Sequence, residues 1–272
     1  MPSLDTKKLT ALVDADILVY HCGFSADSQV LREFKDSNPG ASKDTTDEWI
    51  AEQDYVNYAL SNTKTLLVKW QSMFHKDLKL FLTGTGNFRD RLATIQPYKG
   101  NRVESFKPKY YRDITDYLMD FWGAELVNGR EADDALGCEQ WDVWKDGHDS
   151  TIIISIDKDL DNIPGYHYNW RKELLYYVDL DAADRKFWKQ VVTGDTTDNI
   201  RGIPGCGPVF AEKLLADKAG WIDYHEAVLG AYKAKGHSED DFYENASLAW
   251  IQRVKDLNFD DRPYVIKQDA PF

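Results

Sequence analysis

Cysteine is scarce in this 272-residue chain, and no long hydrophobic run occurs in it. The three cysteines, Cys22, Cys138 and Cys206, are far apart and form no CxxC pair, which excludes a disulfide framework or a cysteine-rich zinc site. No run of about 18 apolar residues and no signal-like start is present, so we expect no membrane span and no export. The sequence predicts a soluble, cytoplasmic protein with reduced thiols.

Basic charge is also in short supply. The chain has 33 Lys and Arg against 46 Asp and Glu, a net charge of −13, which is the wrong sign for general affinity to nucleic acid. One segment differs, because cations and aromatic rings alternate along it, as in single-strand binding paths. Its residues are Arg89, Arg91, Tyr98, Lys99, Arg102, Phe106, Lys107, Lys109, Tyr110, Tyr111 and Arg112. A solvated helix face is the alternative; the acidic excess lies elsewhere, so we expect a polarised surface.

Short apolar runs alternate with helical patterns along the chain. Strands are expected near 9–14, 78–82, 125–127, 151–156 and 174–178, and helices near 48–75, 112–122, 132–145, 184–192 and 208–217. Such alternation predicts an α/β fold with a parallel sheet. A polar, mobile insertion is expected between the first strand and residue 47, and a largely helical tail from residue 221. We divide the chain into a core, 1–180, and a helical region, 181–272.

Acidic residues follow two of these strands. Asp14 ends the first apolar run, and Asp157 and Asp159 come after the run at 151–156. Open α/β sheets bind ligands at the carboxyl ends of their strands. In an extended chain Asp157 and Asp159 would project on one side. The alternative for Asp14 is a helix cap.

Three further acids, Glu131, Asp133 and Asp134, open the helical pattern at 132–145. The helix dipole favours one acid in a first turn, which is the simple explanation for any of them alone. Three carboxylates so close together repel one another unless cations neutralise them. We therefore interpret the group as a metal site.

The string Thr193-Gly-Asp-Thr-Thr-Asp-Asn-Ile-Arg-Gly-Ile-Pro-Gly-Cys-Gly-Pro208 joins two acids to a glycine-rich turn. Asp195 and Asp198 are three residues apart, so both can face one hard cation. Pro208 suits the first position of a helix, whose free amides can bind a phosphate. An ordinary Asp/Gly turn is the alternative for the glycines alone.

This string resembles the helix-three-turn-helix segment of the 5′ nuclease family, which includes flap endonucleases, 5′-exonuclease domains of bacterial DNA polymerases and bacteriophage 5′→3′ exonucleases. The other acidic motifs occur in the family's order, and the pair Phe88-Arg89 and the string Tyr98-Lys-Gly-Asn-Arg102 also match. The sequence departs where the family has an Asp at the end of another strand, since Thr83 stands there. A water, the Thr83 hydroxyl or Asp16 would then replace the missing metal ligand.

The resemblance implies a parallel-sheet, PIN-like core with a helical arch at about 86–122 and a helix-three-turn-helix at about 184–218. It implies two Mg²⁺ ions, replaceable by Mn²⁺, and K⁺ at the turn. One ion would be held by Asp14, Glu131 and Asp133, and the other by Asp134, Asp157, Asp159, Asp195 and Asp198. Lys99 and Arg102 would act catalytically on the scissile phosphate, and Tyr98 would stack on a base. Nucleic acid would also contact Arg89, Lys107, Lys109, Gly202, Gly205, Gly207 and Lys213.

The implied activity is metal-dependent 5′→3′ exonuclease or flap endonuclease cleavage of DNA with 5′ ends, flaps or nicks, and of RNA in RNA–DNA hybrids. The chain looks most like the bacteriophage members, which places it in the host cytoplasm as a monomer, off the membrane, with replication proteins as partners. Two alternatives remain: a non-catalytic DNA-binding replication protein on this fold, and a PIN-like ribonuclease. Eight acids facing a polyanion favour the enzyme, because without metal each repels the ligand.

Overall fold

A six-stranded sheet forms the centre of the protein. The computed structural model describes residues 4–75, 77–101, 107–257 and 259. The strands lie in the order β3-β2-β1-β4-β5-β6, and all neighbours are parallel except β5 and β6. Their bounds are β1 Thr10–Asp14, β2 Leu78–Thr83, β3 Glu125–Val127, β4 Thr151–Ile154, β5 Gly165–Asn169 and β6 Leu174–Val178. The predicted α/β class is confirmed, although β5 was not predicted.

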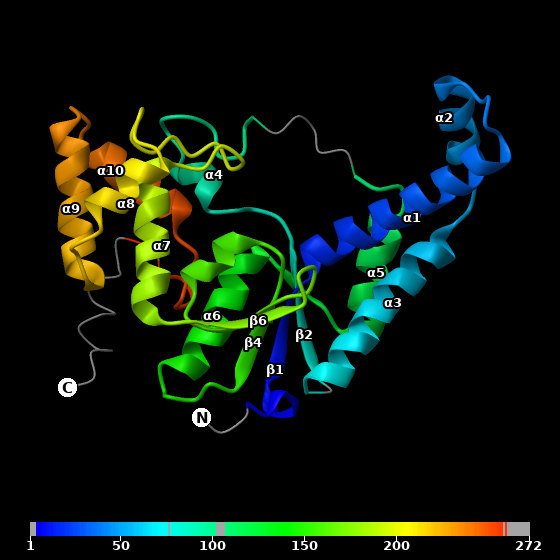
Figure 1. The fold of residues 1–272 in the computed structure, drawn as a ribbon, viewed down its shortest axis with the longest axis horizontal. Coiled ribbons are helices and arrows are strands. Elements are labelled where there is room, and N and C mark those ends of the chain that lie inside the picture. The colour runs from blue at the N-terminus through cyan, green and yellow to red at the C-terminus, as the bar shows by residue number, and fades with distance from the viewer. Residues whose placement is uncertain (1–3, 76, 102–106, 258, 260–272) are drawn as a thin grey trace.

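Helices cover both faces of the sheet (Figure 1). Ala11 and Val13 of β1 face a core shared with α1 (Ala15–Ser37), α3 (Val56–Met73) and α5 (Tyr111–Trp122). Leu12, between them, faces the core beneath α6 (Ala132–Trp144). Alternation with period 2 therefore buries β1 on both sides, as expected for a central parallel strand.

The long helix α1 replaces the mobile insertion that we predicted before residue 47, so that prediction is wrong. Leu18, Cys22, Ala26 and Val30 recur every four residues on α1 and are buried against the sheet and α3. Polar residues on the other side of α1 hide this stripe in the sequence.

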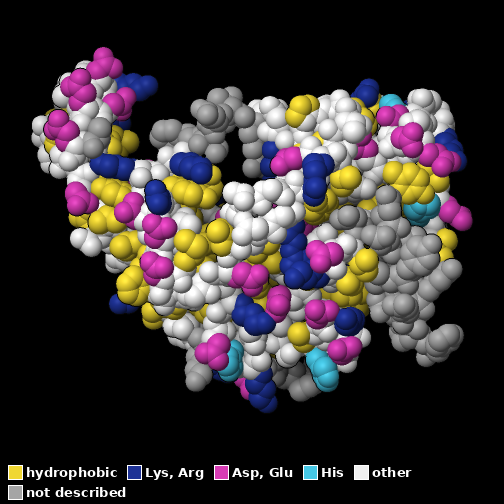
Figure 2. Space-filling model, turned by 180° about the vertical axis from the view of Figure 1, so that it is seen from behind, with side chains coloured by type: hydrophobic (Ala, Val, Ile, Leu, Met, Phe, Trp, Pro, Cys, Tyr) yellow, Lys and Arg dark blue, Asp and Glu magenta, His cyan; other side chains and the backbone are white. Residues whose placement is uncertain are grey.

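The predicted helix at 48–75 is two helices, α2 (Lys43–Glu52) and α3. Acidic side chains gather on the tip formed by α2, whereas elsewhere on the same face they mix with basic ones (Figure 2).

The predicted helical region is present as a second packed cluster, and its boundary with the sheet stays a prediction. It contains α7 (Leu180–Thr193), α8 (Pro208–Leu214), α9 (Gly220–Ala234) and α10 (Glu239–Ala249). Fully buried aromatic rings, including Trp188, Tyr232 and Phe242, fill its core. The remaining elements are short: η1 (Thr6–Lys8), α4 (Arg89–Leu92) and η2 (Lys158–Asn162). All three cysteines are buried and unpaired, and no helix in the described ranges has the length and apolar content needed to cross a bilayer.

Candidate functional site

Five carboxylates surround one hollow of about 500 Å³ at the carboxyl edge of the parallel strands. They come from separate elements. Asp14 ends β1, Asp16 lies in the first turn of α1, and Asp157 follows β4. Glu131 and Asp133 lie at the start of α6. The carboxylates belong to Asp14, Asp16, Glu131, Asp133 and Asp157, and the other side chains of the hollow include Tyr20, Thr83, Lys99, Lys107 and Tyr111. The sheet thus brings together four of the acids that we predicted as metal ligands.

Asp14 is held firmly in this hollow. Its Oδ2 accepts a hydrogen bond from Ser155 Oγ at 2.7 Å, and its Oδ1 caps α1 by accepting from the Ile17 amide at 3.3 Å. Burial, and then the charge of Asp16, raise the pKa of Asp14 to about 7. Asp14 therefore both caps a helix and faces the site, two roles that we had treated as alternatives.

The pKa of Asp133 is raised for similar reasons. Its pKa is raised well above the ordinary value by desolvation first, and then by the charges of Asp14, Asp157 and Glu131. Removing these acids from water and holding their like charges close together are both costly, so the hollow favours whatever neutralises them. A divalent cation does so most effectively because it adds two positive charges.

The donor set fits such a cation. All five acids offer oxygen, the ligand that Mg²⁺ and Mn²⁺ prefer. Among the described residues, no three Asp, Glu, His or Cys side chains already converge tightly enough to bind a metal ion. The site therefore has the right chemistry and excess charge, and its side chains need to turn toward a shared ion.

Asp157 and Asp159 do not lie on one side of an extended strand, so that prediction is wrong. β4 ends at Ile154, and Asp157 caps η2 by accepting a hydrogen bond from the Asp159 amide at 2.8 Å. Asp159 consequently lies away from the hollow, with its Oδ1 3.3 Å from Lys186 Nζ. Burial and the charge of Asp157 raise the pKa of Asp159 to about 6. Asp157 thus stands between the hollow and a second acidic group.

Asp195 and Asp198 also separate. Asp195 accepts from the Thr197 amide at 2.7 Å and from Gln190 Nε2 at 3.2 Å, and its charge acts on Asp159. Asp198 instead accepts from the Tyr98 hydroxyl at 2.9 Å. The two carboxylates therefore have different partners and do not face one point as we predicted.

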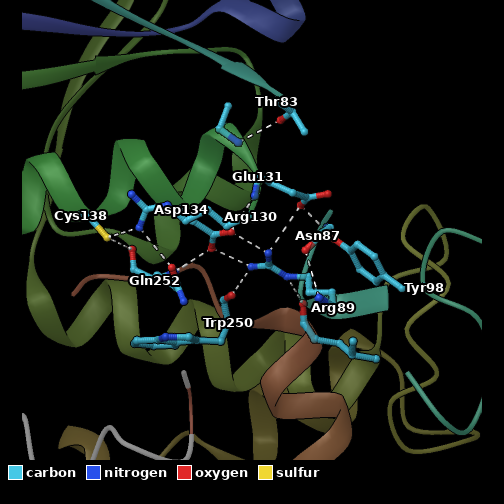
Figure 3. A network of polar contacts seen from close by, with 12 residues as sticks. Thr83, Asn87, Arg89, Tyr98, Arg130, Glu131, Asp134, Cys138, Trp250 and Gln252 are labelled. Atoms are coloured by element: carbon cyan, nitrogen blue, oxygen red, sulfur yellow. Dashed lines mark hydrogen bonds and ion pairs between the residues drawn. The ribbon is translucent and has the colours of Figure 1, made fainter. Parts of the chain in front are cut away.

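Asp134 is not available as a metal ligand. It is fully buried, and its two oxygens accept from Arg89 Nη1 and Nη2 at 2.7 and 2.8 Å (Figure 3). The same carboxylate accepts from the amides of Glu131 and Gln252. Arg89, 2 % exposed, cannot bind nucleic acid either. Both predictions fail because the two charges neutralise each other inside the protein.

Tyr98 is buried as well, so it cannot stack on a base as the resemblance implied. Its hydroxyl donates to Glu131 Oε2 at 3.1 Å (Figure 3). The same hydroxyl also contacts Asp198 Oδ2 at 2.9 Å. The next residue, Lys99, has a left-handed backbone with φ of 53° and points its ammonium into the hollow. There it pairs with Glu131 and lies 3.8 Å from Asp198 Oδ2. Tyr98 and Lys99 thus tie the acids of α6 to the turn after α7.

The glycines of that turn differ from one another. Gly202 is buried with φ of 62°, its amide donates to Asn245 Oδ1, and an added Cβ would meet Gly194 N at 2.3 Å. Gly202 is therefore required by packing, and the prediction that it contacts nucleic acid is wrong. Gly205 and Gly207 are exposed with open space around them, and Pro208 begins α8 as predicted. Lys213 on α8 is exposed too.

Among the other predicted contacts, Arg102 lies outside the described residues. Lys107 lines the hollow, with its ammonium 4.2 Å from the centre of the Tyr111 ring. Lys109 donates to the backbone carbonyls of Ile50 and Gln53, so it fastens its segment to α2. Lys109 is exposed, and its contact with nucleic acid stays a prediction.

Two aromatic rings line the hollow, Tyr111, which belongs to the predicted single-strand path, and Tyr20, which sequence reasoning missed. Their centres are 5.3 Å apart in an edge-on contact. Tyr20 is four residues after Asp16 on α1, a spacing that puts both on one side of a helix. The signal was present, but it is meaningful only once this segment is known to be helical.

Comparisons with known proteins agree with this picture. No family model matches the chain. An exodeoxyribonuclease of Enterobacteria phage T3 is 29 % identical over 180 residues, which cover 65 % of this chain and 56 % of the relative, so the match spans about half of that relative's length. An exonuclease of Escherichia phage T7 is 27 % identical over 214 residues, which cover 67 % of this chain and 71 % of the relative.

Solved structures show the same fold. A bacteriophage T5 5′-exonuclease with bound zinc matches with a TM-score of 0.57 at 16 % identity, over 88 % of each chain. A variant T5 flap endonuclease, solved with DNA and metal ions, matches with a TM-score of 0.56 at 15 % identity and the same coverage. In sequence and in fold, the chain is similar to the phage 5′ nucleases.

Proposed function

We propose that this chain hydrolyses phosphodiester bonds of DNA at 5′ ends, as a metal-dependent 5′→3′ exonuclease or flap endonuclease. One observation carries the proposal: five carboxylates and two lysines from distant parts of the chain share one open hollow at the carboxyl edge of the sheet. The acids suit cations that neutralise a phosphate and activate water, and the lysines suit the phosphate itself. The names of the T3 and T7 relatives agree with this activity.

The acids divide into two groups, which suits two ions. Asp14, Asp16, Glu131 and Asp133 would serve one, while Asp159 and Asp195 would serve the other, with Asp157 between the groups. Asp198 would act through Tyr98 and Lys99. We expect Mg²⁺, replaceable by Mn²⁺; such ions, when bound, activate a water and stabilise the leaving oxygen.

Lys99 is placed to contact the scissile phosphate. Its left-handed backbone is fixed by an amide that donates to the Asp198 carbonyl at 2.8 Å, so the ammonium enters the hollow from a defined position. A preorganised cation stabilises the negative charge that develops as the bond breaks. Arg102, as in the resemblance, would assist. Because Tyr98 is buried, Tyr20 and Tyr111 are the rings of the hollow that would contact an unpaired base.

The turn between α7 and α8 would bind the duplex. Gly205 and Gly207 expose backbone next to the start of α8, and Lys213 adds a cation on the same helix. Small residues let a phosphate backbone approach closely without reading sequence. We propose that this turn belongs to a helix-three-turn-helix motif and that it binds K⁺.

Product sizing tests the proposal. Flap, nicked-duplex and RNA–DNA substrates, each labelled at the 5′ end, are incubated with Mg²⁺ or with EDTA. We expect short labelled products only with Mg²⁺. Binding of the same substrates without any cleavage would instead favour a non-catalytic DNA-binding protein, and cleavage of single-stranded RNA alone would favour a PIN-like ribonuclease.

A further inference from the structure

A second hollow, of about 320 Å³, lies beside the first and has a different chemistry. Its charged side chains are mainly basic, because Arg91, Arg130 and Lys255 outnumber Asp256. Phe88, Asn128, Gly129 and Gln252 complete its lining. In a chain whose net charge is −13, three cations around one cavity are a marked local excess.

None of these cations has an acidic partner among the residues that the structure describes. Within the described ranges, no acidic side chain forms an ion pair with Arg91, Arg130 or Lys255. Arg130 uses its guanidinium on neutral acceptors, Gln252 Oε1 at 3.2 Å and Cys138 Sγ at 3.4 Å. Arg91 and Lys255 are exposed. The basic pocket therefore keeps an attraction for anions that its described surroundings do not neutralise.

The walls of the pocket are rigid. The Phe88 amide donates to the Gly129 carbonyl at 3.0 Å, and the Gly129 amide donates to the Thr85 carbonyl at 2.8 Å. Gln252, which holds Arg130, donates its own amide to Asp134 of the buried Arg89 pair. A cavity fixed by such bonds loses little entropy when it binds a ligand.

Two consecutive residues connect the pocket to the candidate active site. Glu131 extends toward Tyr98 and the acidic hollow, whereas Arg130 extends toward Gln252 and Cys138 (Figure 3). The buried Arg89 and Asp134 lie between these two sets of contacts. The two hollows are therefore joined by adjacent residues of one segment, because Arg130 lines the second and Glu131 lines the first.

We propose that the basic pocket formed by Arg91, Arg130 and Lys255 binds a backbone phosphate of the DNA substrate away from the bond that is cut. Phosphate is the favoured ligand because a guanidinium and an ammonium together match its shape and charge. The contact is independent of sequence, since no base edge is read. It rests on the proposed function only in taking DNA as the polyanion.

The test measures binding, not cleavage. A labelled nicked duplex is titrated with wild type, Arg91→Ala, Lys255→Ala and the double variant, with Ca²⁺ in place of Mg²⁺, at several salt concentrations. Loss of this phosphate contact should reduce the slope of log affinity against log salt by about 0.9, so from about 50 to about 200 mM salt the double variant should lose about 3.5-fold less affinity than wild type. Lys64→Ala, which removes a cation from exposed α3, is the matched control and should leave the slope unchanged.

A double variant that melts like wild type and binds DNA with the wild-type affinity and slope overturns the proposal. The proposal is also overturned if the pocket binds only free anions. In that case inorganic phosphate raises the melting temperature of wild type but not of the double variant, and DNA binding is the same in both proteins. Neither result touches the proposed cleavage, because Asp133→Asn tests that separately on the same substrates.

Discussion

The carboxylate of Asp16 accepts a hydrogen bond from the backbone amide of Thr83, with both oxygens 3.1 Å from the nitrogen. Thr83 occupies the position where we expected an acid from the resemblance, and its hydroxyl accepts from the Ala132 amide at 2.9 Å. The Thr83 side chain also interacts with Asp16 by a hydrogen bond. Asp16 reaches the same place from α1 and lines the hollow. We infer that it supplies the charge that Thr83 lacks.

Asp16→Asn should therefore weaken divalent metal binding by about tenfold or more while the fold is kept, because Asn can still accept from the Thr83 amide. Mn²⁺ titration followed by electron paramagnetic resonance measures this directly. The double variant Asp16→Asn/Thr83→Asp returns a carboxylate to the hollow and should recover part of the affinity. Wild-type Mn²⁺ affinity in Asp16→Asn would remove Asp16 from the metal site.

The buried pair of Arg89 and Asp134 makes a different prediction. Asp134→Asn removes the main counter-charge of the buried Arg89 guanidinium and leaves Glu131 at 3.9 Å. This should lower the free energy of unfolding by about 3–5 kcal/mol. Urea denaturation measures the loss. The exposed pair of Lys69 and Glu173 is the control, since Glu173→Gln should cost less than about 1 kcal/mol. If Asp134→Asn instead lost Mn²⁺ binding at full stability, Asp134 would be a ligand after all.

Lys99→Ala should slow the chemical step by about a hundredfold and change DNA affinity much less, because its charge acts on the transition state. Single-turnover rates at saturating protein separate the two effects. Lys213→Ala, on exposed α8, provides the contrast and should reduce affinity alone. A Lys99→Ala variant that changes affinity without changing the single-turnover rate would make Lys99 an ordinary phosphate contact.

Stability without metal should depend on pH through Asp14. Its pKa is about 7 in the folded chain against an ordinary 3.8, so the folded state holds this proton more tightly than the unfolded state. The resulting stabilisation is complete below about pH 4 and is lost as the pH rises through about 7. Mg²⁺ should consequently raise the melting temperature more at about pH 8 than at about pH 5.5. Asp14→Asn, which keeps the helix cap, should show a smaller change of melting temperature with pH in the absence of metal. The same pH dependence as in wild type would contradict this assignment.

The order of acids along an α/β chain was enough to predict where Asp14, Glu131, Asp133 and Asp157 meet, because parallel strands end at a common edge. Asp134 and Tyr98 could not be assigned correctly in this way. Their roles depend on Arg89 and Asp198, partners that only the folded chain brings near. Asp159 was misplaced because η2 interrupts the extension, and the helix α1 was missed because its apolar stripe is narrow and surrounded by polar residues.

The central claim is that the acids of the hollow hold metal for cleavage and do not hold DNA. Asp133→Asn and Asp157→Asn test it most directly, through single-turnover cleavage of a 5′ flap at saturating Mg²⁺ beside DNA binding in Ca²⁺. The account predicts that each change lowers cleavage by at least about a hundredfold and leaves binding unchanged or tighter, because a repelling charge is removed. Substantial turnover by both variants at saturating Mg²⁺ would contradict it.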